Sequence, residues 1–348
     1  MKVPMKYILL GCAFFVAIFG FSLLTSYYPE ILWYDSFGYL PIWWFVLKAK
    51  TGVFLGFFTV AFLFFLSNVL IARRSRNTTV SEPIQFHPKM QVLEQLFSRL
   101  SQAKEQSSFL SLPSKIHGIA LYFAIFIVSI YFGLSGGAFW EAFYQYLNPT
   151  TFGIADPIFN QDVSFYMFTL PFFKLIQGWF SKLILIGLGL VIWIYLSHNL
   201  LVLLFAQKKP TQIKSHIFVL LSLLFVSISF GIWIKLFSIL YSTSGVVFGA
   251  GYADHHAQLL GYKILLGMTV LQSAVFLLWG FRSGFRIPVY SFGLMILVSI
   301  VFGNIYPGII QSYVVAPNEL VKETPYIEKS IEFTHLAYNL DKIEEKNF

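Results

Sequence analysis

Seven apolar stretches, each near 20 residues long, constrain this sequence more than any other feature. A helix needs roughly 20 consecutive apolar residues to cross the hydrocarbon core of a bilayer, where it satisfies its own backbone hydrogen bonds. The stretches are 6–25, 51–71, 116–136, 178–206, 216–240, 261–280 and 288–308. We therefore expect residues 1–308 to form an all-α, polytopic membrane bundle of about seven transmembrane helices.

Composition supports a membrane protein. Charged residues make up 11% of the 348 residues, against roughly 25% in soluble domains. Hydrophobic residues make up 57%, which is more apolar surface than a soluble fold of this size could hide. The formal net charge is +8, but the basic residues flank the apolar stretches, so this charge does not indicate a nucleic-acid partner. The expected partner is the lipid bilayer of the cytoplasmic (inner) membrane.

The distribution of Lys and Arg predicts the orientation. Fourteen of the 24 basic residues fall in the N-terminal segment and in alternate connections: Lys2, Lys6, Arg73, Arg74, Arg76, Lys89, Arg99, Lys104, Lys115, Lys208, Lys209, Lys214, Arg282 and Arg286. Only three of the 16 acidic residues accompany them, namely Glu82, Glu94 and Glu105. Because basic residues favour cytoplasmic loops, we expect the N-terminus inside and the C-terminus outside.

The longer connections have different characters. The inner loop 72–115 carries apolar residues at helical spacing between Lys89 and Leu100, which predicts an amphipathic helix on the inner membrane surface. The expected outer loops are 26–50, 137–177 and 241–260, and they are rich in aromatic residues. Tryptophan and tyrosine rings favour the membrane interface, although the rings of 26–44 could alternatively line a substrate groove.

Few polar residues fall within the predicted spans, and none of them is Asp or Glu. We expect Gln272 and Asn304 to make polar contacts between helices, and His198 and Asn199 to form hydrogen bonds near the inner end of the fourth span. The sequence contains no phosphate-binding glycine loop, HExxH helix, cysteine cluster or G-x-S-x-G motif. It therefore predicts no cofactor and no familiar enzyme site.

The stretch GAGYADHHAQLL, at 249–260, is the best candidate for chemistry. If it is extended, Asp254 and His256 point to the same side, and a third metal ligand could come from Asp162, Asp156 or Glu141. The alternative is a solvated loop tip in which Asp254 caps the sixth span. In the segment 156–173, Asn160 or Asp162 can cap a short helix that Pro171 helps to end.

The tail, 309–348, is polar and becomes acidic after Pro317. Thr324 can cap a helix that has Pro325 at its first position, which predicts one amphipathic helix over 325–338. Its apolar side must pack on the outer face of the bundle or on another protein.

The chain resembles uncharacterised protein family 0182, a family of large bacterial membrane proteins. Four stretches carry the resemblance: LWYDSFGYL at 32–40, DPIFNQDVSFYMFTLPFF at 156–173, GAGYADHHAQL at 249–259 and QSYVVAPNELVKETPYI at 311–327. The resemblance implies seven spans followed by a large extracytoplasmic domain, and this chain stops soon after that domain would begin. It implies no activity.

Three functional hypotheses follow. The first is a structural or assembly protein whose outer loops and tail dock an extracytoplasmic protein partner. The second is a transporter or lipid-handling protein with a polar path through Gln272, Asn304, His198 and Asn199. The third is a membrane-surface enzyme that uses Asp254 and His256, with or without a divalent cation.

Overall fold

The computed structural model describes residues 5–79, 114–205, 211–282 and 284–343. The predicted amphipathic helix between Lys89 and Leu100 lies outside these residues. Apart from one isolated antiparallel bridge between Ala155 and Asp162, the described residues form helices, turns and irregular segments. The long helices are α1 (Met5–Ser36), α2 (Leu40–Thr79), α4 (Ser114–Gly137), α6 (Leu170–Phe205), α7 (Thr211–Ser238), α8 (Leu259–Gly280), α9 (Arg286–Ile300) and α11 (Glu319–Tyr338).

The predicted all-α membrane bundle is confirmed. Six helical segments of the described residues are long and apolar enough to cross a bilayer: 40–75, 118–137, 165–196, 212–241, 254–280 and 286–338. They overlap the second to seventh predicted spans, although the third begins two residues after the predicted start and the fourth ends ten residues before the predicted end. The first predicted span, 6–25, falls in α1, and most of its side chains lie outside the described part of the chain.

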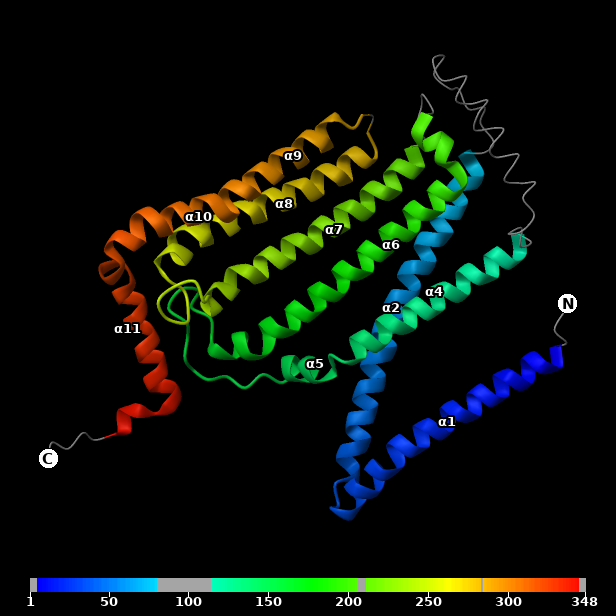
Figure 1. Cartoon of the computed structure of the whole chain (residues 1–348), viewed down its shortest axis with the longest axis horizontal. Helices are drawn as coiled ribbons and strands as arrows, with labels where there is room; N and C mark the ends of the chain where they lie inside the picture. Colours follow the sequence, from blue (N-terminus) through cyan, green and yellow to red (C-terminus); the bar gives the residue numbers. More distant parts are fainter. Residues whose placement is uncertain (1–4, 80–113, 206–210, 283, 344–348) are drawn as a thin grey trace.

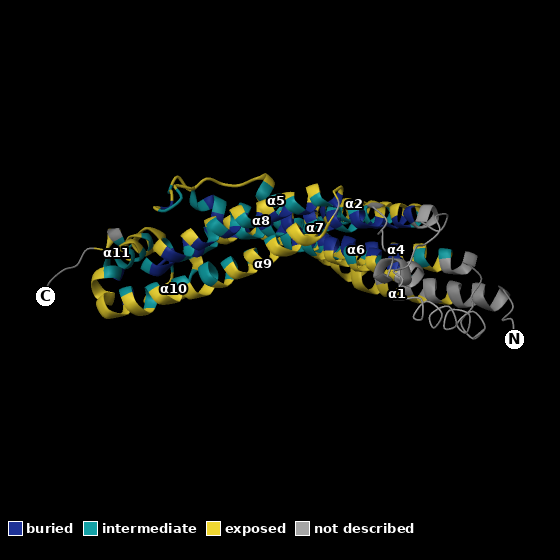
Figure 2. Ribbon diagram, turned by 90° about the horizontal axis from the view of Figure 1, so that it is seen from above, coloured by how far each residue is buried: buried dark blue, intermediate teal, exposed yellow. Residues whose placement is uncertain are grey.

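Helices α4, α6, α7, α8 and α9 lie side by side in one layer. Helix α2 crosses this layer at one edge, where it packs against α4, α6 and α7 (Figure 1). Buried residues run along the middle of this layer, whereas the outward face of α9 is largely exposed (Figure 2). Such exposed apolar faces suit contact with lipid.

The main core lies where α2, α4, α6 and α7 meet, and aromatic side chains fill it. Phe65, Phe132 and Trp179 are almost fully buried, and the Trp179 indole Nε1 donates to the Phe132 carbonyl at 3.0 Å. This bond joins α6 to α4 while the indole ring packs edge-on against Phe57 of α2. One aromatic side chain therefore holds three helices together.

Small hydroxyl residues make most of the polar contacts between the helices. Ser222 and Ser273 join α7 to α8 at 3.0 Å, and Ser229 donates to Thr269 at 2.9 Å. A buried chain of Tyr195, His216 and Asn68 links α6, α7 and α2, with hydroxyl-to-ring and ring-to-amide distances of 2.9 Å each. Hydrogen bonds of this kind stabilise membrane helix pairs by about 0.6 kcal/mol each on average.

The residues that were predicted to make polar contacts between helices lie in different environments. Gln272 is 2% exposed on α8, and its side-chain Nε2 has no hydrogen-bond partner among the described residues. Asn304 is exposed, in the π turn η5 (Val301–Ile305) that follows α9. His198 and Asn199 lie on α6, and their side chains are outside the described part of the chain. The structure therefore does not bring Gln272 and Asn304 into one polar path.

The connections that were predicted to be outer loops contain more helix than the sequence predicts. Residues 26–50 were expected to be a loop, but α1 and α2 extend through them and leave only Phe37–Tyr39 between them. Gly38 makes this tight turn possible because its φ of 74° is one that residues with a side chain rarely adopt. Within 137–177, α5 (Trp140–Leu147) precedes an irregular segment, 148–162.

Three prolines that follow π turns lie inside helical segments, and one of them, Pro171, was expected to end a helix. Pro171 does not end a short helix, because the chain continues from the π turn η2 (Phe165–Thr169) straight into α6. The same relation holds for η5 before Pro307 and for η6 (Ile310–Val315) before Pro317, since each π turn ends two residues before the proline. The wider turn accommodates the proline ring and the missing N–H donor, so the helical path persists.

Candidate functional site

The functional candidates gather at the end of the layer where α6 and α8 begin and α7 ends (Figure 1). Two aspartates organise the segment before α6. Asp156 accepts backbone N–H bonds from Ile158, Phe159 and Gln161, and a hydroxyl bond from Tyr166 at 2.8 Å. The Asp156 side chain is therefore committed to shaping the turn that packs against α7.

Asp162 has the same kind of role. Its carboxylate accepts backbone N–H bonds from Ser164 at 2.8 Å, from Gly153 at 2.9 Å and from Phe152 at 3.2 Å. The bond from Ser164 contributes most to lowering the pKa of Asp162 below its usual value. Asp162 thus caps the helical segment that leads into α6, and its oxygen atoms already have three backbone donors.

Asp254 lies in the first turn of the helix that continues into α8, and not in an extended loop. The helix begins at Tyr252 and passes through the π turn η4 (Asp254–Gln258). The Asp254 carboxylate accepts the Gly251 N–H at 3.2 Å and the Ser244 hydroxyl at 2.9 Å, and the residue is 5% exposed. An acidic residue at this position satisfies the free N–H groups of a helix start and interacts well with the helix dipole.

Because this segment is helical, Asp254 and His256 do not point the same way as they would in a strand. Residues two apart on a helix lie on different faces. His256 is exposed and stacks on the Tyr252 ring at 4.2 Å between ring centres. The half-buried His255 faces the tail, where its Nδ1 lies 3.0 Å from the Tyr326 hydroxyl.

The predicted metal ligands are not assembled in the described residues, which contain no cluster of three His, Cys, Asp or Glu side chains able to hold an ion. Asp254, Asp156 and Asp162 all accept bonds from the chain itself. The Glu141 carboxylate, on α5, lies 3.4 Å from the Gln145 amide nitrogen. Their geometry is that of groups that shape loops and cap helices.

No sequence pattern indicated the central residue of this site. Glu323, on α11, is 2% exposed, and its carboxylate accepts the backbone N–H of Tyr252 at 3.1 Å. The tail therefore caps the helix leading into α8 from a position 71 residues further along the chain. Gly251 allows this approach, because a Cβ there would lie 3.1 Å from a Glu323 carboxylate oxygen.

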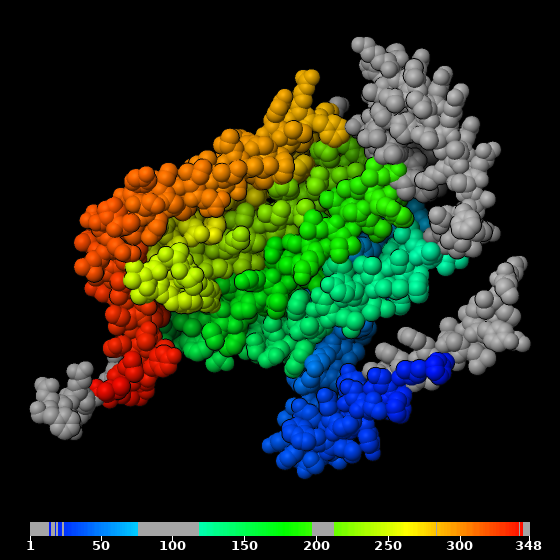
Figure 3. Space-filling model, in the orientation of Figure 1, coloured from blue at the N-terminus to red at the C-terminus, as the bar shows by residue number. Residues whose placement is uncertain are grey.

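We call this contact the tail junction and define it by Ser244, Gly251, Tyr252, Asp254, His255, Glu323 and Tyr326. In the tail junction, the buried carboxylates of Asp254 and Glu323 both accept backbone N–H groups at the start of the helix that leads into α8. In Figure 3 the segment before α8 (yellow) lies directly against α11 (red). The α11 helix crosses the end of the layer (Figure 1) and begins at Glu319, so Thr324 lies inside it and does not cap it.

A cleft of about 590 Å³ lies beside the tail junction, between α11 and the loops that precede α6 and α8. Its walls are mostly apolar and include Leu240, Val247, Phe248 and Phe333, while His255 and Lys329 supply polar groups. The cleft has the mixed lining of a binding surface, but no pair of groups in it is arranged for acid–base chemistry.

Long apolar helices packed in one layer, with a further helix tied across one end, define an all-α polytopic membrane bundle. No solved structure matches this chain. The chain belongs to the family described as Uncharacterised protein family (UPF0182), whose family model matches residues 7–348.

Relatives of this family cover nearly all of the chain. A UPF0182 protein of Desulforamulus reducens is 32% identical over 97% of this chain and 37% of its own length. Those of Sulfurovum sp. and Thermobifida fusca are 32% and 30% identical over 100% and 96% of this chain, and 36% and 31% of their own lengths. The chain thus spans about a third of the length of the relatives it matches.

Proposed function

We propose that this protein is a membrane-embedded docking platform whose tail helix, α11, binds an extracytoplasmic polypeptide. The observation that carries the proposal is the tail junction, because a buried carboxylate fixes α11 across the end of the bundle. A tail that only trailed into solvent would need no such contact. The junction keeps the helix in one orientation, which lowers the entropy lost when a partner binds.

The outward side of α11 suits a protein partner. Leu320 and Val321 are 77% and 73% exposed, and Ile331 and Leu336 are 53% and 46% exposed. Exposed apolar residues on an ordered helix, next to a cleft of about 590 Å³, are typical of interaction sites. The partner we expect is an extracytoplasmic polypeptide that packs apolar side chains against this side of α11.

The alternative functions receive less support from the site. An enzyme that uses Asp254 and His256 needs the two groups to face one substrate, but Asp254 is buried while His256 is exposed. A transport path through Gln272 and Asn304 needs a shared environment, but one is buried in the layer and the other is on its surface. Docking through α11 requires neither of these arrangements.

Photo-crosslinking tests the proposal. A benzophenone amino acid at Val321, which is 73% exposed on α11, is expected to trap a polypeptide in native membranes. The matched control site is Leu147, which is 53% exposed on α5, and it is expected to trap little protein. Mass spectrometry should identify the Val321 adduct as a polypeptide segment exposed outside the cytoplasm. Adducts with lipid alone, or equal trapping from both sites, would refute docking through α11.

The proposal places the tail outside the cytoplasm, as the basic residues predict for an inner-membrane protein. We expect alkaline phosphatase fused after Phe348 to be active and green fluorescent protein fused there to be dark. The same pair of reporters fused after Arg76, in the predicted inner loop, should give the opposite result. Fluorescence from the C-terminal fusion would place α11 inside and rule out an extracytoplasmic partner.

A further inference from the structure

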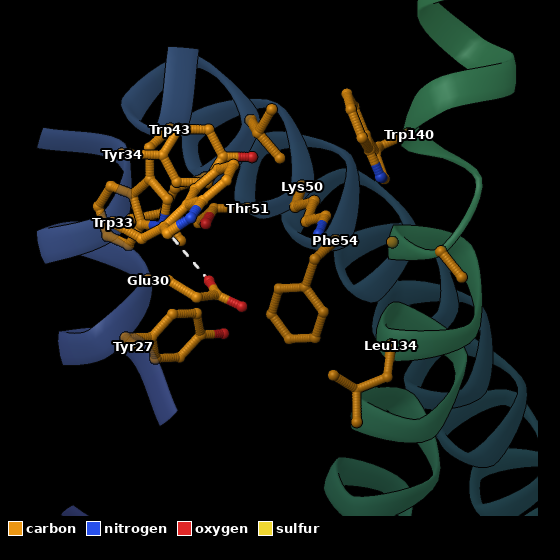
Figure 4. A pocket seen from close by; sticks show the side chains of 14 residues that line it. Tyr27, Glu30, Trp33, Tyr34, Trp43, Lys50, Thr51, Phe54, Leu134 and Trp140 are labelled. Carbon is orange, nitrogen blue, oxygen red and sulfur yellow. Dashed lines mark hydrogen bonds between the residues drawn. The ribbon is translucent and has the colours of Figure 1, made fainter. Parts of the chain in front are cut away.

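A second cavity lies at the other edge of the layer, between α1, α2 and α4, and it is independent of the tail junction. Its volume is about 840 Å³. It lies near the turn at Gly38, where α1 and α2 meet, since Tyr34 and Trp43 line it. Figure 4 shows that its polar groups come from two sides, with Glu30 on α1 and Lys50 on α2.

One wall combines a carboxylate with aromatic rings. Glu30 points into the cavity among Tyr27, Trp33 and Tyr34 (Figure 4). The Trp43 indole Nε1, 3.4 Å from Glu30 Oε2, orients the carboxylate. Tyr27 packs edge-on against Trp43 with ring centres 6.3 Å apart, which fixes the rings around the acid. A carboxylate surrounded by aromatic rings attracts an ammonium group through its charge and through cation–π contacts.

The opposite wall carries the positive charge. The Lys50 ammonium lies 5.6 Å from the centre of the Trp140 ring and reaches into the cavity beside Thr51. In the part of the chain that the structure describes, Lys50 and Glu30 do not pair with each other, although both line the same cavity. The cavity thus offers a negative group and a positive group to one occupant.

The position of the cavity along the helices identifies the kind of occupant. Lys50 lies where the apolar run of α2 begins, and the residues before it include Trp43 and Trp44. Tryptophan and lysine at the end of an apolar helix mark the headgroup level of the bilayer. Leu134 and Phe54 line the deeper side of the same cavity, where the start of an acyl chain would lie.

We infer that this cavity binds a zwitterionic phospholipid headgroup, with its ammonium beside Glu30 and its phosphate beside Lys50. The recognised chemistry is an ammonium and a phosphate held on one short linker. A primary ammonium would also donate a hydrogen bond to Glu30, whereas a quaternary one would bind through the rings and the charge alone. The bound lipid would fill the wedge between α1 and the rest of the bundle.

Native mass spectrometry of the purified full chain tests this inference, with phosphatidylethanolamine, phosphatidylcholine and phosphatidylglycerol of identical acyl chains as probes. We expect the first bound lipid to be held at least about fivefold more tightly when it carries an ammonium. Glu30→Gln should remove most of this preference, because the amide keeps its contact with Trp43 but has no charge, and only the rings then attract the ammonium. Lys50→Gln should weaken the binding of all three lipids, because each of them contains the phosphate.

Asp35→Asn is the matched control, since it removes one negative charge from the same helix but does not line the cavity. It should leave the lipid preference unchanged. Tighter binding of phosphatidylethanolamine than of phosphatidylcholine would show that the ammonium donates a hydrogen bond to Glu30. Equal binding of these two lipids would show that the charge and the aromatic rings recognise the ammonium. Both outcomes support the site. Equal binding of phosphatidylglycerol, or a Glu30→Gln variant that behaves like Asp35→Asn, would overturn it.

Discussion

Replacing Glu323 with alanine is expected to release α11 from the bundle without unfolding the spans. The substitution removes a carboxylate that is 2% exposed and leaves the Tyr252 N–H without its acceptor. Loss of a buried hydrogen bond to a charged group costs about 2–3 kcal/mol. Amide hydrogen exchange should therefore speed up by roughly 30- to 150-fold over residues 319–338, whereas exchange in α7 should stay as it was.

Two further variants show whether the carboxylate itself is responsible. Glu323→Gln keeps the shape and one acceptor oxygen, so its effect should lie between wild type and Glu323→Ala. Glu332→Ala removes an acid from the same helix that is 55% exposed and pairs with Lys329 at 2.9 Å. Such a surface pair contributes little, so exchange in this variant should resemble wild type. If Glu332→Ala loosens α11 as much as Glu323→Ala does, the tail junction does not hold the helix.

The spans could be predicted from the sequence because membrane insertion depends on local composition. A run such as 216–240 must be helical in lipid whatever its neighbours are, since its backbone has no other hydrogen-bond partner. Residues 26–50, in contrast, were predicted to be a loop and are mostly helical. Their aromatic rings indicated an interface, but nothing in the pattern of these rings shows that helices α1 and α2 continue through the segment to a turn at Gly38.

Proline was the least reliable local signal. Pro171 was interpreted as a helix end, yet it follows a π turn that lets the helix continue. A π turn has one more residue than an α turn. This wider turn accommodates the proline, which has no N–H to donate, while the backbone hydrogen bonds of the helix continue on either side. The sequence shows the proline but not the widened turn before it.

The site could be predicted only in part. Asp254 was recognised as a possible helix cap from its local context, and it does accept the Gly251 N–H. Glu323 could not be recognised, because its partner, Tyr252, is 71 residues away and only the path of α11 brings the two together. Neither residue carries a pattern that distinguishes it from a solvated acid until the helices are placed in space.

Replacing Gly261 with alanine is expected to separate the last spanning segment from α8. A Cβ at Gly261 would overlap the Phe302 carbonyl oxygen, and a backbone atom cannot move aside as a side chain does. Overpacking of this kind costs about 1–3 kcal/mol. The effect should fall on this segment in particular, because Pro288 is the only buried residue described in α9 and η5 approaches α8 closely at Gly261.

Gly267→Ala, on the same helix, is the matched control. A Cβ at Gly267 has no neighbour within 4 Å, so alanine should leave the protein as stable as before or raise the free energy of unfolding by up to about 1 kcal/mol through its better helix propensity. Thermal unfolding of both variants in the same detergent, followed by tryptophan fluorescence, measures the difference. A melting temperature that falls in Gly261→Ala but not in Gly267→Ala identifies the contact with Phe302 as the cause. If the two variants melt together, the close approach of η5 to α8 does not hold the last span in the bundle.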